Sequence, residues 1–155
     1  MKAKKLLVLF LTALMALTIL TACGGGSNKL DMDDVNAKVV SMGGDAVVEN
    51  DGRLNSAVRA VANEFRRRST YSAAAANDIM VDLLPNLTWR LSTAVLTEAD
   101  VLADGGSPEQ IAASGCVTQQ ETNGDGYEYY ACAMSVENAD DEVIWIICSW
   151  AVLPL

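Results

Sequence analysis

The sequence predicts an α+β fold: a three-layer α/β/α sandwich around a small antiparallel sheet, with helices in the N-terminal half and a three-stranded meander at the C-terminus. Apolar residues recur at helical spacing through much of residues 31–84. Residues 116–155 instead hold aromatic and β-branched runs between Gly- and Asp-rich turns. The last run, residues 143–152, is apolar at both odd and even positions. Such a strand needs cover on both faces, which helices on both sides would provide.

The first elements are expected to be helical. Residues 32–42 have apolar side chains at helical spacing, three aspartates stand near their start, and Gly43-Gly44 follows them. After a short extended piece at 46–48, the clearest helix covers residues 54–68, and another covers 73–84. The stripe of the clearest helix is Leu54, Val58, Val61 and Phe65.

The second half is expected to turn from helix to strand. Residues 86–103 are ambiguous, because 89–95 alternate like a strand whereas 98–103 have a helical pattern. Ser107-Pro108-Glu109 favours the start of a short helix, since Ser can cap it and Pro fits its first turn. The runs at 116–122, 127–136 and 143–152 are the three predicted strands of the meander.

The N-terminus has the three parts of a secretory signal. Three lysines among the first five residues precede an apolar run over residues 6–19, and small residues lead to Cys23. Leu20-Thr21-Ala22-Cys23 resembles the lipobox of bacterial lipoproteins. That resemblance implies lipidation of Cys23, cleavage before it, and stable anchoring at the extracytoplasmic side of a bacterial cell membrane through several acyl chains.

This address divides the chain into a signal peptide (1–22), a lipidated cysteine with a flexible tether (23–29) and one globular extracytoplasmic domain (30–155). Cleavage leaves 133 residues, enough for one hydrophobic core. It also removes three of the 11 basic residues, so 8 face 20 acidic ones, a net charge of −12. Such an acidic chain is a poor partner for nucleic acid.

The sequence contains no histidine. Ser-His-Asp and Cys-His catalysis, histidine-ligated zinc and a histidine pH switch are therefore excluded. Scattered carboxylates such as Glu98 and Glu109 offer acid–base groups, but nothing in the sequence brings two together. No catalytic residue, cofactor or metal ligand is assigned.

Two segments resemble the CAP (SCP-like) domain. The first runs from Asp34-Val35-Asn36-Ala37 through Gly43-Gly44 to Glu64, and the second is the closing run 142–151. The resemblance implies a three-layer sandwich around an antiparallel sheet. It implies no metal site, because the family's two cleft histidines have no counterpart here; a CAP domain in this chain would be a degenerate one.

Three cysteines, Cys116, Cys132 and Cys148, lie 16 residues apart, one on each predicted strand. A three- or five-residue loop would place Cys132 opposite Cys148, and a three-residue loop would place Cys116 opposite Cys132. Either disulfide, or three reduced apolar cysteines, is compatible with an exported chain.

Other features have a functional and a structural interpretation. Arg66-Arg67-Arg68, with Arg59, would suit an anionic lipid or acidic partner, but three cations also suit a helix C-terminus. Asp140-Asp141-Glu142 and Asn123 with Asp125 offer calcium ligands, but also form turns. Five aromatic residues in the second half of the chain would either line a groove for an apolar ligand or fill the core. They are Tyr127, Tyr129, Tyr130, Trp145 and Trp150.

The sequence therefore favours a lipid-anchored binding or interaction domain, CAP-like or not, whose partner is a protein, a wall component or an apolar ligand. Two alternatives stay open: a carboxylate-dependent hydrolase acting on cell-wall material, and a structural surface lipoprotein.

Overall fold

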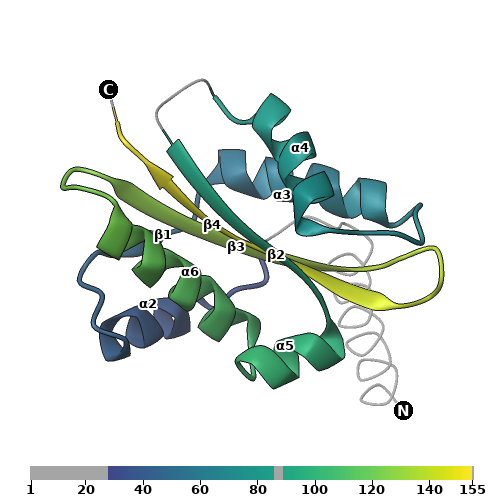
Figure 1. The fold of residues 1–155 in the computed structure, drawn as a ribbon, viewed down its shortest axis with the longest axis horizontal. Helices are drawn as coiled ribbons and strands as arrows, with labels where there is room; N and C mark the ends of the chain where they lie inside the picture. The colour runs from purple at the N-terminus through teal and green to yellow at the C-terminus, as the bar shows by residue number, and fades with distance from the viewer. Residues whose placement is uncertain (1–27, 86–88, 155) are drawn as a thin grey trace, which may run out of the picture.

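The computed structural model describes residues 28–85 and 89–154 as a three-layer α/β/α sandwich (Figure 1). Its elements are α2 (Met32–Ser41), β1 (Val48–Glu49), α3 (Gly52–Phe65), α4 (Ala73–Leu83), β2 (Trp89–Thr97), α5 (Glu98–Asp104), α6 (Pro108–Thr122), β3 (Glu128–Glu137) and β4 (Val143–Val152). The predicted α+β class is confirmed, and the ambiguous segment is strand β2 followed by helix α5.

The central sheet has four strands in the order β1-β3-β4-β2. β3 pairs antiparallel with β4, and β4 pairs antiparallel with β2. The short strand β1 runs parallel to β3, so the expectation of a purely antiparallel sheet is wrong at this one edge. Of the predicted three-stranded meander only the hairpin of β3 and β4 is present, and the third antiparallel strand of the sheet is β2.

Each face of the sheet has its own core. α3 and α4 pack on one face, against alternate β4 residues that include Ile146, Cys148 and Trp150. α2, α5 and α6 pack on the other face, against residues that include Ile147 and Ala151. The alternation along β4 is therefore the predicted one, and both of its faces are covered.

Residues 116–122 form the end of helix α6, so the strand predicted there is wrong. Ser107 caps this helix by accepting a hydrogen bond from the Gln110 N–H at 3.2 Å, and Pro108 lies in its first turn. The helix does not stop after a few residues, because a row of small side chains packs against the sheet over its whole length. That row includes Ala112, Ala113 and Cys116.

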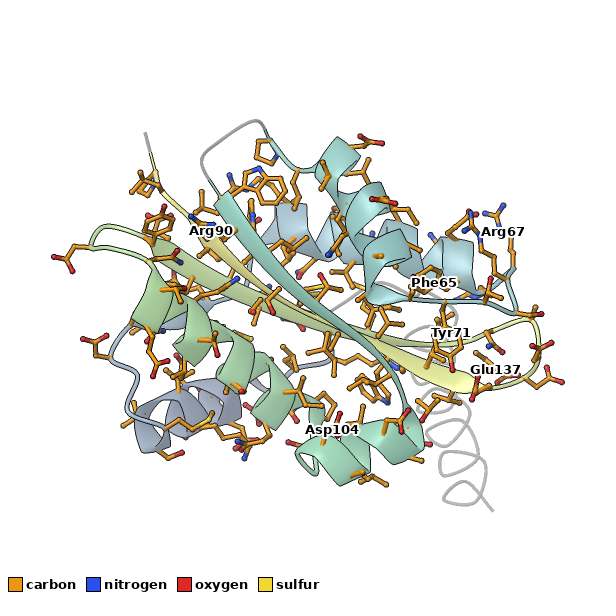
Figure 2. All side chains as sticks on the ribbon, in the orientation of Figure 1. Phe65, Arg67, Tyr71, Arg90, Asp104 and Glu137 are labelled. Atoms are coloured by element: carbon orange, nitrogen blue, oxygen red, sulfur yellow. The ribbon has the colours of Figure 1, made fainter. Side chains whose placement is uncertain are left out.

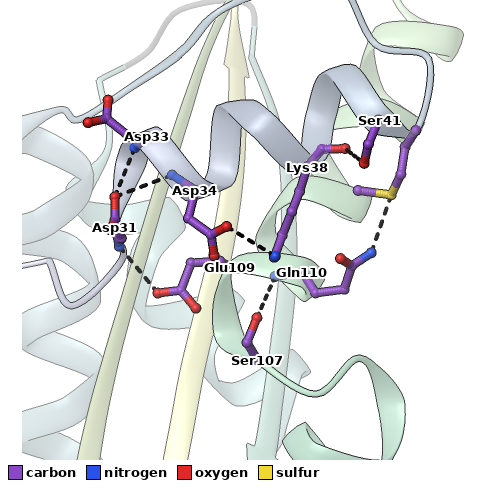
Figure 3. Close-up of polar contacts among 9 residues, drawn as sticks. Asp31, Asp33, Asp34, Lys38, Ser41, Ser107, Glu109 and Gln110 are labelled. Carbon is purple, nitrogen blue, oxygen red and sulfur yellow. Dashed lines mark hydrogen bonds and ion pairs between the residues drawn. The ribbon is translucent and has the colours of Figure 1, made fainter.

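α2 begins where α6 begins (Figure 3). The Asp31 carboxylate accepts hydrogen bonds from the backbone N–H groups of Asp33 and Asp34, and caps the helix. Asp34 pairs one turn later with Lys38 at 3.1 Å. The backbone N–H of Asp31 donates to the carboxylate of Glu109 on α6 at 3.2 Å, which joins the two helix starts.

The first described residues belong to the domain and not to the tether predicted over residues 23–29. The Asn28 side chain donates to the Ala131 carbonyl at 2.9 Å and accepts from the Ala133 N–H at 3.0 Å. The Lys29 N–H donates to the Ala133 carbonyl at 2.8 Å. Asn28 and Lys29 thus continue the pairing of β3 beyond the end of β1.

The outer side of β1 is closed by one side chain of α2. Asn36 accepts a hydrogen bond from the Val48 N–H at 2.8 Å and donates to the Val48 carbonyl at 2.9 Å. An amide side chain can replace a neighbouring strand in this way, because it carries both a donor and an acceptor. This edge of the sheet is therefore blocked to further strands.

Candidate functional site

β2 forms the opposite edge of the sheet and lacks such protection. Within the described residues it pairs with β4 alone, over nine consecutive positions without a bulge. None of its nine residues is buried, Arg90 is its one charged residue, and it contains neither proline nor glycine. Natural edge strands are usually short, bulged or charged, because free N–H and C=O groups attract other strands.

The two helical layers leave space beside β2 on both faces. On the α6 side, a cavity of about 320 Å³ is lined by residues that include Leu96, Asp104 and Ile111. On the α4 side, a cavity of about 300 Å³ is lined by residues that include Val81 and Leu91. In Figure 1, β2 crosses in front of β4 and β3 with α4 above it and α5 below it. A strand added to this edge would therefore find room for its side chains.

The helices flanking β2 also expose large apolar side chains. Val81 and Leu83 on α4 are 50% and 54% exposed, and Leu102 on α5 is 65% exposed. Exposed apolar residues are common singly, but Val81 also lines the cavity on the α4 side of this strand. We name the surface of this strand the β2 edge, defined as strand β2 with Val81 and the two cavities.

The charges of the β2 edge lie at its two ends (Figure 2). Arg90 stands near the start of the strand, and Asp104 stands at the end of α5, which follows the strand. Both residues are exposed, and neither takes part in an ion pair among the described residues. The edge thus offers one cation on the strand and one anion in the cavity beside Leu96.

The structure separates the three predicted cysteines between the two cores. Cys132 and Cys148 are directly opposite on β3 and β4, as predicted for the five-residue loop 138–142. Cys116 lies on α6, in the other core. The alternative pairing of Cys116 with Cys132 required a strand at 116–122 and would have to cross the sheet. All three are free, buried thiols.

Burial makes these thiols poor nucleophiles. It raises the pKa of Cys148 to about 12, against a smaller opposing effect of its hydrogen bond with Thr93. It raises the pKa of Cys116 to about 12, against a hydrogen bond with Ser149. It also raises the pKa of Cys132, and nearby Cys148 adds to the shift. A protonated thiol neither attacks nor binds a metal readily.

The predicted acidic calcium segment, Asp140-Asp141-Glu142, is a hairpin turn. Asn138 accepts hydrogen bonds from the backbone N–H groups of Asp140 and Glu142 at 2.9 and 3.0 Å. The Asp140 carboxylate accepts from Ser69, and the Glu142 carboxylate accepts from Tyr71. These carboxylates hold the segment after α3 against the hairpin. Across the described part of the chain, no three acidic or thiol groups cluster as metal ligands.

The other predicted calcium residues, Asn123 and Asp125, lie beside a small polar cavity. The cavity has a volume of about 150 Å³ and is also lined by Asp45, Tyr127 and Tyr129. Burial raises the pKa of Tyr129, against a hydrogen bond with Asn123. Two carboxylates, from Asp45 and Asp125, therefore share one cavity, a juxtaposition that the sequence did not indicate.

Of the remaining residues singled out in the sequence, Arg68 and Glu109 make hydrogen bonds within the fold. Arg68, which follows α3, donates to the Glu64 carboxylate from Nε at 2.8 Å, and its carbonyl accepts from the Ala139 N–H. Glu109 joins α6 to α2, whereas Glu98 lies exposed at the start of α5. The partner of the basic patch stays a prediction.

The predicted aromatic groove does not form as one surface. Tyr130 and Trp150 lie in the core beneath α3, with ring centroids 5.6 Å apart. Tyr129 is buried in the opposite core, and the half-buried Tyr127 and Trp145 pack against that core. The core interpretation is therefore confirmed for Tyr129, Tyr130 and Trp150, whereas Tyr127 and Trp145 are half-buried.

Sequence reasoning missed the β2 edge. The alternation of Trp89, Leu91, Thr93 and Val95 indicated a strand, but a strand's position in the sheet depends on pairings that are distant in sequence. The one available signal was composition: nine residues with a single charge, no proline and no glycine.

Within residues 28–85 and 89–154, every helix is too short or too polar to cross a membrane. Comparison with known proteins gives no match: no family model, no curated protein and no solved structure matches this chain.

Proposed function

We propose that this chain is a lipid-anchored, extracytoplasmic binding domain that takes an extended partner strand at the β2 edge. The observation that carries the binding part is the unpaired nine-residue strand between two cavities. A partner strand would gain main-chain hydrogen bonds from the edge, and its alternate side chains would enter the cavities.

The anchor part is supported by residues 1–23 of the sequence. The lipobox-like Leu20-Thr21-Ala22-Cys23 makes Cys23 the attachment point. Four residues separate Cys23 from Asn28, and the five Cα–Cα steps between these two residues span at most about 18 Å when extended. Asn28 lies against β3, on the side of the sheet opposite to β2. A membrane attached there would leave the β2 edge accessible.

Fatty-acid labelling of the full-length chain in a bacterial host tests the anchor. Wild type is expected to incorporate label and to fractionate with the membrane. Cys23→Ala should do neither, whereas Cys116→Ala, which removes a buried thiol, should behave like wild type. Labelling that survives Cys23→Ala would contradict the anchor assignment.

A synthetic peptide with the sequence of residues 89–97 tests the binding part. The fluorescently labelled peptide is expected to bind the full-length protein in detergent, measured by anisotropy. The same peptide with proline at the position of Thr93 should bind at least tenfold more weakly, because it lacks an N–H group. Equal binding of the two peptides would contradict strand addition.

The predicted hydrolase keeps one specific observation in its favour. Asp45 and Asp125 line one cavity, and glycan hydrolysis needs two carboxylates about 5–9.5 Å apart. Asp45→Asn and Asp125→Asn would each abolish release of sugars from wall material if this cavity were catalytic. Unchanged or absent release in all three proteins would exclude that role. The CAP relationship stays a prediction, since three layers are its only structural support.

A further inference from the structure

We infer that the strand accepted by the β2 edge is β2 of a second copy of this chain, paired antiparallel about Thr93. This inference rests on the proposed strand-binding function of the edge and names its partner. The result is a symmetric dimer with one continuous sheet, formed from two four-stranded sheets.

Symmetry and side-chain parity fix the register. Residues directly opposite in an antiparallel pair point to the same face. The two-fold axis must therefore pass midway between the two copies of one residue, so that this residue lies opposite itself. Thr93 is the middle residue of β2, and centring there pairs all nine residues. Any other centre leaves part of the edge unpaired.

This register matches the surfaces of both faces. On the α4 face, Leu91 lies opposite Val95 of the second copy, and both already pack partly against that core. On the α6 face, the exposed Ser92 lies opposite the small Ala94. Apolar and small cross-strand pairs of this kind stabilise sheets, and the register contains no like-charge pair.

The same register joins the two isolated charges. Arg90 comes opposite Leu96 of the second copy. Both residues share the parity of Ala94, which faces α6, and Arg90 also borders the cavity on the α4 side. Leu96 and Asp104 line the same cavity on that face. In this register the long Arg90 side chain of each copy can reach the Asp104 carboxylate of the other, and symmetry makes two such contacts.

Charge also favours a copy of this chain as the partner. The chain is strongly acidic after cleavage, so most of its surface repels a second copy. β2 is an exception, since its one charge is positive and its complement, Asp104, lies on the same edge. Membrane anchoring would add to the association by concentrating the copies. A two-fold axis along the membrane normal keeps both Asn28 ends at one height.

Charge reversal of the full-length lipoprotein in detergent tests the dimer, with sedimentation velocity as the measurement. Wild type is expected to be a dimer. Arg90→Asp and Asp104→Arg should each raise the dissociation constant at least tenfold, and the double variant should recover most of the loss. Arg66→Asp, which changes an exposed arginine after α3, is the matched control and should dimerise like wild type.

Amide exchange of the wild-type protein gives a second measurement that does not depend on a variant folding. Dilution of the dimer should increase exchange at β2 and leave exchange at β3 unchanged.

A monomer that binds the 89–97 peptide would overturn the second copy as the partner and keep the strand-binding function. A dimer insensitive to both reversals, or one that leaves β2 exchange unchanged, would also overturn it. A monomer that binds no peptide would overturn both proposals.

Discussion

Cys132 of β3 and Cys148 of β4 are directly opposite each other, on the face of the sheet that α3 and α4 cover. Opposite residues in an antiparallel pair have Cα atoms about 4.5 or 5.5 Å apart, which lies within the range that disulfides span. Their raised pKa values make both thiols unreactive once the protein is folded. Any bridge must therefore form before the core closes.

If the chain is exported as proposed, we expect it to contain the Cys132–Cys148 disulfide. The two thiols would transfer two electrons and two protons to an external disulfide, such as that of an oxidoreductase. Unfolded without reductant, the domain of residues 28–155 should then expose one titratable thiol, that of Cys116, instead of the three free thiols of its reduced form. Cys116→Ala should expose none. Three titratable thiols in the untreated wild type would exclude the bridge.

Gly115 lets α6 approach the sheet. A Cβ atom at this position would lie 2.5 Å from the Ser149 Oγ and 3.4 Å from its Cβ. Alanine normally stabilises a helix relative to glycine by about 1 kcal/mol. We expect Gly115→Ala to lower the free energy of unfolding instead, by about 1–3 kcal/mol, because overpacking outweighs helix propensity.

Urea unfolding measures this effect, and two variants control it. Gly52→Ala in α3, where nothing lies within 4 Å of the added Cβ, should not destabilise. Adding Ser149→Ala to Gly115→Ala removes the nearest atom and should restore part of the loss. A Gly115→Ala protein as stable as wild type would contradict the close approach.

Asp51 connects stability to pH at the start of α3. Burial alone would raise the pKa of its carboxyl group, but hydrogen bonds from the Arg53 side chain and from the backbone N–H groups of Arg53 and Leu54 outweigh burial, so the pKa is lowered from 3.8. A lowered pKa gives stability that is present above about pH 4 and is lost as pH falls through the folded-state value.

We expect Asp51→Asn to keep the helix cap and to lose this contribution, because an amide accepts hydrogen bonds without titrating. Asp51→Ala should cost about 1 kcal/mol at neutral pH, through loss of the cap. Urea unfolding at pH 7 and pH 3 measures both. If the gap between wild type and Asp51→Asn is the same at the two pH values, the carboxylate does not contribute in this way.

The fold was predictable where local pattern and tertiary environment agree. β4 alternates between two apolar sets, and each set faces its own core. Helix α3 has a continuous apolar stripe from Leu54 to Phe65, and it is the buried stripe of the structure.

Prediction failed where small residues decide the packing. Between Cys116 and Thr122 the sequence contains the β-branched residues Val117, Thr118 and Thr122, which favours a strand locally. The helix forms there because Gly115 and its small neighbours pack closely against β4. This contact joins segments that are distant in sequence. The candidate site was missed for the same reason, since only the sheet order shows that β2 has no second neighbour.

Asn36 provides the last prediction, because it replaces a strand at the closed edge of the sheet. Its side chain bonds to both backbone groups of Val48 and also donates to the Met32 carbonyl at 2.9 Å. Asn36→Ala would leave these β1 groups without a partner, and we expect a loss of about 1–3 kcal/mol in unfolding free energy. Asn36→Asp keeps the acceptor and loses the donor, so it should also lower the free energy of unfolding.

Amide exchange at Val48 should accelerate in Asn36→Ala while exchange in β4 stays slow, as expected for local opening of one edge. Equal exchange at Val48 in wild type and Asn36→Ala would show that the side chain does not hold the edge closed.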